Sequence, residues 1–192
     1  MTSPVTIAVF TKNHTNPGYA AARLAADRVA LEAGARTVHY VPEIPDDIGQ
    51  QKALIGQAIA ARPSAVIFTP VDDALMVEDM ERFTTAGIPV ILFNNRMAGR
   101  FVSFVGSDDV AVGRDGAAML FRGLGGSGTI VAIEGTPAAP TSRDRTTGLH
   151  RALAESRGIT LLASVTGMYQ RDRKSTRLNS VTFRNLVCRL LL

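Results

Sequence analysis

Short apolar runs alternate with longer helical segments along most of this 192-residue chain, and that alternation constrains the fold most. The runs AVIF (65–68) and VILF (90–93) are continuously apolar, which is typical of strands buried on both faces of a parallel sheet. Strands are predicted at Thr6–Phe10, Thr37–Tyr40, Ala65–Thr69, Val90–Phe93, Phe101–Val105, Thr129–Glu134 and Ile159–Val165. With helices between most of them, the pattern predicts an α/β fold of doubly wound parallel sheets.

Capping residues mark the expected helix ends. Acidic pairs at 46–47, 72–73 and 108–109 stand where helices are expected to begin, and Asn16 precedes Pro17 in the same way. Gly34 and Gly87 stand where two helices end. The carboxylates of these pairs are therefore read as caps rather than as catalytic or metal-binding groups.

The positive charge of the chain is concentrated at its end. Of 21 Lys and Arg residues five lie in 172–192, against one of the 17 Asp and Glu residues, so the remainder is neutral and gives no reason to expect nucleic acid as a partner. Within this segment DRKSTRLNS (172–180) and NLVCRLLL (185–192) resemble translated sequencing adapter. We therefore expect 172–192 to be a non-native tail; the alternative is a basic amphipathic tail that ends in an apolar Leu run.

Ligands of open parallel sheets bind beyond the carboxyl ends of the strands, so the loops there are the candidate site. Amide and guanidinium groups can hydrogen bond vicinal hydroxyls, and an aromatic ring can cover the C–H face of a sugar. Such groups fill these loops, and the candidate ligand-binding residues are Lys12, Asn16, Tyr19, Asn94, Asn95, Arg143 and Tyr169. The pattern indicates a site for a small polar ligand.

Signatures of enzymes and metal sites do not match these loops. The glycine-rich run at 123–128 precedes a strand, whereas a phosphate-binding loop follows a strand and opens a helix. The histidines at 14, 39 and 150 share no metal-ligand spacing, and no serine lies in a G-x-S-x-G elbow. We therefore expect no enzymatic activity, no cofactor and no metal.

Four segments carry a family resemblance: TIAVFTKNHTNPGY (6–19), AGIPVILFNNR (86–96), FVGSDD (104–109) and SRDRTTGLHRAL (142–153). In this order the chain resembles, over 4–171, the periplasmic sugar-binding proteins of ABC importers of the ribose-binding type. The resemblance implies two α/β lobes that are joined by crossing strands and close on one solute. It places a first lobe at 1–105, without its return segment, and the start of an incomplete second lobe at 106–171.

The resemblance also assigns roles in the first lobe. Asn16 matches the Asn before Pro at the end of the first strand, and Tyr19 matches an aromatic that stacks on the sugar. Gly18 replaces a second aromatic, and Lys12 stands where a small polar residue is common. The alternatives are that Asn16 is only a helix cap and that Tyr19 only packs on its helix.

The remaining assignments concern two further loops. Asn94 and Asn95 occupy the positions of an Asp-Arg pair that binds sugar hydroxyls, although both could be turn formers. Arg143 matches a ligand-binding arginine of the second lobe, and Tyr169 falls where an aromatic covers the ligand. Arg145 is expected to be a surface or supporting residue instead.

The function that this resemblance implies is capture of a small polar solute, a monosaccharide or polyol, for an ABC permease. We expect a monomer located in the periplasm or otherwise outside the cytoplasm, although Met1–Pro4 runs straight into the apolar stretch Val5–Phe10 without a signal-peptide pattern. The alternative function is the effector domain of a lactose-repressor-type transcription regulator. That alternative needs a helix-turn-helix, which does not precede Val5.

Overall fold

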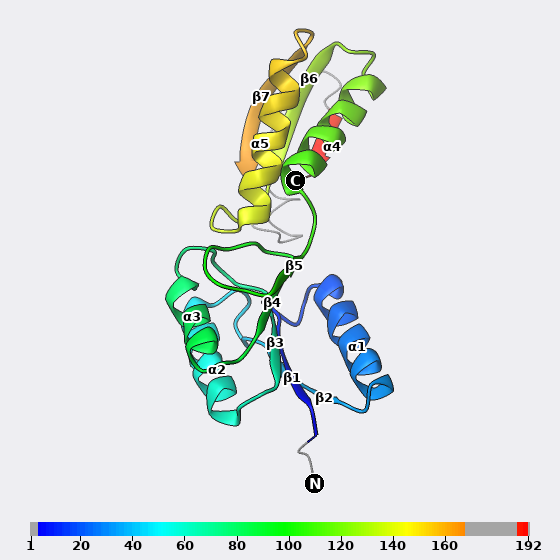
Figure 1. Cartoon of the computed structure of the whole chain (residues 1–192). Coiled ribbons are helices and arrows are strands. Elements are labelled where there is room, and N and C mark those ends of the chain that lie inside the picture. The colour runs from blue at the N-terminus through cyan, green and yellow to red at the C-terminus, as the bar shows by residue number, and fades with distance from the viewer. Residues whose placement is uncertain (1–3, 168–187, 192) are drawn as a thin grey trace. The chain divides into compact units, whose positions relative to one another are not determined.

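The computed structural model describes residues 4–167 and 188–191. It divides into two compact units, Met1–Gly106 and Ser107–Leu192 (Figure 1). Each unit contains a parallel sheet and a hydrophobic core of its own.

The first unit is built on a sheet of five strands in the order β2-β1-β3-β4-β5. All neighbouring strands pair in parallel, as the apolar runs predict. Because the strands run the same way, their carboxyl ends lie along one edge of the sheet. The strands are β1 (Thr6–Phe10), β2 (Arg36–Tyr40), β3 (Ala65–Phe68), β4 (Val90–Phe93) and β5 (Ser103–Val105).

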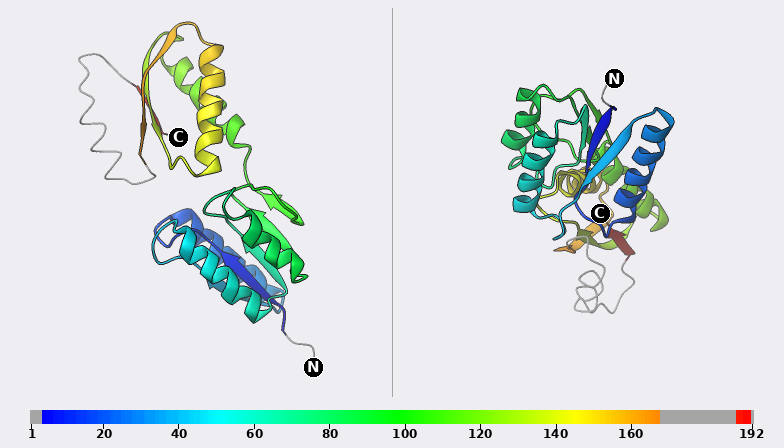
Figure 2. Two further views of the ribbon diagram at one scale, coloured as in Figure 1. Left: turned by 90° about the vertical axis from the view of Figure 1, so that its left-hand side faces the viewer. Right: turned by 90° about the horizontal axis from the view of Figure 1, so that it is seen from below.

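Helices cover the two faces of this sheet unequally. Helices α2 (Ile48–Ala61) and α3 (Val77–Thr85) lie on one face, and α1 (Pro17–Glu32) lies on the other (Figures 1 and 2). The buried core is under α2 and α3, where the Phe10 ring stacks on Tyr40 at 4.8 Å between centroids. On the α1 side, Ile67 of β3 and Phe93 of β4 are only partly buried.

Two of the three helices in this unit begin at predicted caps. The Asn16 Oδ1 atom accepts from the Gly18 N–H at 2.8 Å, and the Asp47 Oδ1 atom accepts from the Gln50 N–H at 2.7 Å. The prediction for the third helix is wrong: Asp72 accepts from the N–H groups of residues 74 and 75, and α3 begins only at Val77. Asp72 thus closes a turn that precedes α3, because its short side chain reaches only the N–H groups two and three residues further along the chain.

The second unit has a sheet of three parallel strands in the order β7-β6-β8. These are β6 (Gly128–Glu134), β7 (Ile159–Thr166) and β8 (Cys188–Leu191). Helices α4 (Asp109–Gly123) and α5 (Pro140–Ala154) pack on each other and on β6. Asp108 caps α4 as predicted, since its Oδ1 atom accepts from the Ala111 N–H at 3.0 Å.

Strand β8 is the element that the sequence pattern does not predict. It lies inside the expected tail at 172–192 and pairs with β6, with Ile130 opposite Cys188 and Ile133 opposite Leu191. A short apolar run of this kind is typical of a strand, but the prediction of a non-native tail excludes this segment from the strand pattern. The non-native origin of 172–192 stays a prediction.

Among the described residues, no helix combines the length and the apolar character that crossing a membrane requires.

Candidate functional site

Polar side chains gather where β1, β3 and β4 end, at one edge of the first unit's sheet. The loop after β1 supplies Lys12 and Asn13, the loop after β3 supplies Asp72, and the loop after β4 supplies Asn94 and Asn95. All of these except Asn94 are buried. Buried polar groups need partners, and the hydrogen bonds among these loops define the geometry of the candidate site.

Lys12 lies in the loop directly after β1, with only 6% of its surface exposed. Its Nζ atom is 3.7 Å from the Asp46 Oδ1 atom, which also accepts from Asn13 Nδ2 at 3.3 Å. Burial lowers the pKa of Lys12 below its usual value, and the attraction of Asp46 opposes that shift. The positive charge of Lys12 is therefore matched by a neighbouring carboxylate, so it does not make the site a general anion site.

Asn16 and Tyr19 form the first turn of α1. Asn16 is exposed and caps the helix, which confirms the capping interpretation; its contact with a ligand stays a prediction. Tyr19 is 7% exposed, and its hydroxyl lies 3.5 Å from Asn94 Nδ2. Tyr19 therefore connects the start of α1 with the loop after β4.

Asn94 and Asn95 form a tight turn after β4, as the turn-forming alternative predicts. Asn94 has a φ of +63°, which is unusual for a residue other than glycine, and the Asn95 N–H donates to the Phe93 carbonyl at 2.7 Å. The Asn94 N–H donates to the Val105 carbonyl at 2.8 Å, so β5 holds this turn in place. Asn94 is half-buried and Asn95 is fully buried.

Gln51 supports the same edge and is not among the residues predicted from the sequence. Its side chain is fully buried on α2, where Nε2 donates to the Thr69 carbonyl at 3.0 Å and Oε1 accepts from the Val71 N–H at 2.9 Å. The available signal was its position, because Gln51 shares the buried face of α2 with Ile55 and Ala58. A polar residue on such a face needs a defined partner.

In the second unit, Arg143 lies in the first turn of α5. Its Nη1 atom donates to the Ala138 carbonyl at 2.8 Å and to the Pro137 carbonyl at 3.3 Å. Arg145 Nε donates to Asp109 Oδ1 at 2.7 Å and so joins α5 to α4. That Arg145 supports the site rather than contacts a ligand stays a prediction. Tyr169 lies outside the described residues.

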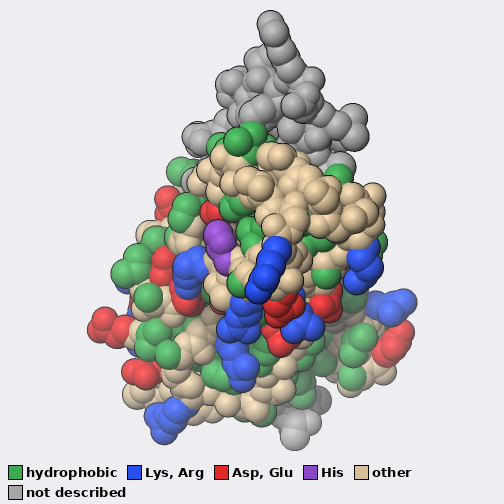
Figure 3. Space-filling view, turned by 90° about the horizontal axis from the view of Figure 1, so that it is seen from above, with side chains coloured by type: hydrophobic (Ala, Val, Ile, Leu, Met, Phe, Trp, Pro, Cys, Tyr) green, Lys and Arg blue, Asp and Glu red, His purple; other side chains and the backbone are tan. Residues whose placement is uncertain are grey.

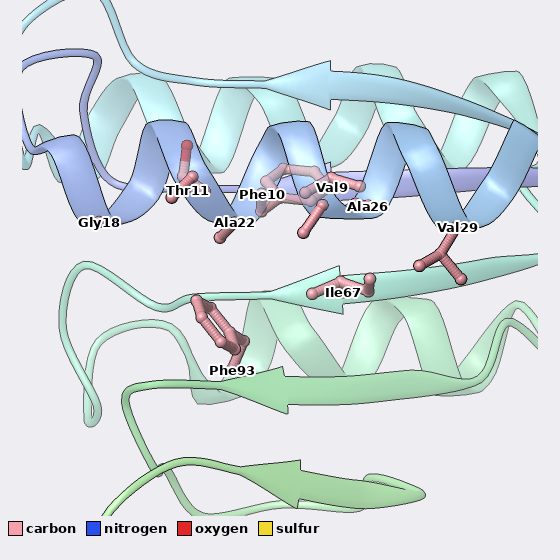
Figure 4. A pocket seen from close by; sticks show the side chains of 11 residues that line it. Val9, Phe10, Thr11, Gly18, Ala22, Ala26, Val29, Ile67 and Phe93 are labelled. Carbon is pink, nitrogen blue, oxygen red and sulfur yellow. The ribbon is translucent and has the colours of Figure 1, made fainter.

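An apolar groove of about 580 Å³ lies between α1 and the sheet, beside this edge. Figure 4 shows Ala22, Ala26 and Val29 of α1 on the side of the helix that faces Ile67 of β3. Among the described residues that line it, Thr11 has the single polar side chain. A polyhydroxylated ligand would lose its hydration there without gaining hydrogen bonds, so the candidate site is the strand-end edge rather than this groove.

The charged side chains of the described residues add no second candidate site. Figure 3 shows basic and acidic side chains interspersed on the face that it draws. Within residues 4–167 and 188–191, no three His, Cys, Asp or Glu side chains come together as a metal site would require.

Comparisons with known proteins assign this architecture. A family model described as the periplasmic binding protein domain matches residues 7–185. The D-apiose import binding protein of Actinobacillus succinogenes is 25% identical over 177 residues, which cover 91% of this chain and 56% of that protein. The ribose import binding protein of Bacillus subtilis is 23% identical over 146 residues, which cover 76% and 47%. The chain thus spans about half the length of the curated relatives that it matches.

Solved structures agree on the fold. The crystal structure of an ABC transporter periplasmic solute binding protein from Actinobacillus succinogenes, with bound D-allose, has a TM-score of 0.85 at 24% identity. The match covers 93% of this chain and 66% of that one, so the structure represents part of the two-lobe fold, as predicted. Because the family model matches most of the sequence, the chain belongs to the periplasmic binding protein domain family.

Proposed function

We propose that the protein to which this chain belongs captures a small neutral polyhydroxylated solute, a monosaccharide or polyol, for an ABC importer. The observation that carries this proposal is the strand-end edge of the first unit, where amides and a charge-balanced lysine converge. Neutral amides match the hydroxyls of an uncharged ligand, whereas the Lys12–Asp46 pair leaves no excess positive charge for an anion. The relatives are named for the import of D-apiose and ribose, which are of this class.

The proposal includes the setting in which the protein works. Members of this family are periplasmic binding proteins, and the relatives belong to import systems, so the partner is an ABC permease in the membrane. We propose that the binding protein works as a monomer in the periplasm or an equivalent extracytoplasmic space. The family and the named relatives give no support to the transcription-regulator alternative, and those relatives are binding proteins rather than enzymes.

A thermal-shift screen of the 192-residue chain tests the ligand class. The panel contains D-ribose, D-allose, xylitol, an amino acid and a nucleotide. A ligand that binds only the folded state at 100 times its Kd stabilises that state by about 2.7 kcal/mol. We expect stabilisation by a sugar or by xylitol, and stabilisation by the nucleotide alone would contradict the proposal.

Asn94→Gly tests the location of the site. Glycine tolerates the positive φ at this position, so the variant removes the amide with little backbone strain. Loss of one ligand hydrogen bond should weaken binding about two- to tenfold by calorimetry. Gln57→Ala, an exposed amide change on α2, is the matched control and should leave the affinity unchanged.

A further inference from the structure

The two asparagines after β4 belong to a hydrogen-bonded chain whose direction is fixed by a carbonyl group. Asn95 Nδ2 lies 2.9 Å from the Pro70 carbonyl oxygen, and a carbonyl can only accept. Asn95 must therefore direct its NH₂ group to Pro70 and its Oδ1 atom to the other side. That oxygen lies 2.8 Å from Asn94 Nδ2, so Asn94 in turn must direct its own NH₂ group to Asn95.

The anchor of this chain of amides is itself held in place. The Gln51 side chain hydrogen bonds to the residues on both sides of Pro70: it donates to the Thr69 carbonyl and accepts from the Val71 N–H. Asn95 is fully buried, and both ends of its amide are used. The amide of Asn95 therefore has a defined orientation and no surface to offer a ligand, in contrast to the sequence-based prediction that it contacts the sugar.

Asn94 is the end of this hydrogen-bonded chain of amides that a ligand can reach. Its NH₂ group is directed to Asn95 Oδ1 and, at 3.5 Å, to the Tyr19 hydroxyl. Among the described residues its Oδ1 atom has no hydrogen-bond partner, and the side chain is only half-buried. The amide of Asn94 is thus oriented so that its oxygen, an acceptor, is the atom left for a ligand.

We propose that Asn95 is a positioning residue that fixes the amide of Asn94, and that Asn94 therefore selects a ligand group able to donate a hydrogen bond. This inference rests on the proposed sugar or polyol function. A hydroxyl satisfies the Asn94 oxygen, whereas fluorine or a carbonyl oxygen at the same place cannot donate. A site built to bond a hydroxyl discriminates against analogues that lack it, because its own polar atom is left unpaired.

The orientation is tested first without ligand, by NMR of the ¹⁵N-labelled 192-residue chain. The side-chain NH₂ protons of Asn94 should exchange with water at least tenfold more slowly than those of the exposed Asn16. Asn95→Leu, which replaces the amide by an apolar side chain of similar size in the buried position, should abolish that protection. Exchange of Asn94 as fast as that of Asn16 in the wild type, or unchanged in the variant, would overturn the proposal.

Selectivity is tested next, with D-ribose and its monodeoxyfluoro analogues in calorimetric titrations. One analogue should bind the wild type about tenfold more weakly than D-ribose. In Asn95→Leu the ratio between the Kd of that analogue and the Kd of D-ribose should fall below about threefold. Without its hydrogen bond to Asn95, the Asn94 amide can turn its NH₂ group toward fluorine. A ratio that persists in Asn95→Leu would overturn the positioning role.

Asn13→Leu is the matched control for selectivity. Asn13 is a buried amide at the same edge, bonded to Asp46 and to the Asn16 N–H but not to Asn94. Its loss can weaken binding but should preserve the ratio between D-ribose and the fluoro analogue. If Asn95→Leu does not fold, Asn95→Ala is measured in its place with the same readouts. If the wild type binds no sugar, the proposed function fails, while the exchange measurement still decides the orientation of the amides.

Discussion

The crossing of α4 and α5 depends on two glycines, and Gly113→Ala tests how tightly the second unit is packed. A Cβ atom at position 113 would lie 2.6 Å from the Cα atom of Arg145, about 1 Å closer than carbon atoms normally approach. Gly148 is restricted reciprocally, because its Cβ atom would lie 2.5 Å from the Arg114 backbone nitrogen. Both obstacles are backbone atoms, which cannot rotate away as a side chain can.

The magnitude follows from two opposing terms. Alanine gains about 1 kcal/mol over glycine from helix propensity, and overpacking costs about 1–3 kcal/mol or more. Separating the helices also stretches the Arg145–Asp109 ion pair, now 2.7 Å long, and opens the core around Phe121 and Leu149. We therefore expect Gly113→Ala to lower the free energy of unfolding of the second unit by about 2 kcal/mol.

Urea unfolding followed by circular dichroism, with hydrogen exchange to assign each transition to a unit, measures this effect. Gly123→Ala in the same helix is the control, because nothing lies within 4 Å of a Cβ atom there. That substitution should be neutral or stabilising by up to about 1 kcal/mol. The reasoning is refuted if Gly113→Ala is as stable as the wild type while the control behaves as expected.

Two further predictions concern titratable groups in the first unit. Burial lowers the pKa of Lys12 below 10.5, so its charged ammonium group lowers the stability of the fold at neutral pH, and this cost is relieved as pH rises toward 10.5. Lys12→Met should therefore raise the melting temperature at pH 7, and the gain should shrink as pH rises toward 10.5. A lower melting temperature of the variant at pH 7 would contradict this prediction. Hydrogen bonds from Thr37 and His39 lower the pKa of Asp27 below 3.8, so its contribution is present above 3.8 and is lost as pH falls through the folded-state pKa. Asp27→Asn should be less stable than the wild type at pH 7, and a gap that does not narrow as pH falls below 3.8 would argue against this linkage.

Much of the fold could be predicted from local patterns. The bounds of β1 and β4 follow from their apolar runs, and Asn16, Asp47 and Asp108 cap the helices predicted for them. These features depend on a few neighbouring residues, which a sequence shows directly. The start of α3 was misplaced because Asp72 caps a turn, and a turn and a helix start share the same acidic signal.

The candidate site was predicted less completely, because its geometry depends on partners distant in sequence. Pro70 is 25 residues from Asn95, and nothing near either residue indicates that they meet. The rule that ligands bind beyond the strand ends placed Asn94 and Asn95 at the edge where the structure has them. It could not show that Asn95 is fully buried whereas Asn94 is half-buried. Gln51 was missed for the same reason, since both of its partners belong to the loop after β3.

An NMR titration of the ¹⁵N-labelled chain with D-ribose, D-allose and xylitol tests the central claim, that a sugar or polyol binds at the strand-end loops. The account predicts saturable shift changes concentrated in residues 12–19 and 94–96. Changes concentrated at Ala22, Ala26 and Val29 would instead assign the ligand to the apolar groove and contradict the claim. No saturable change with any of the three ligands, beside a clear response to a nucleotide, would contradict both the site and the ligand class.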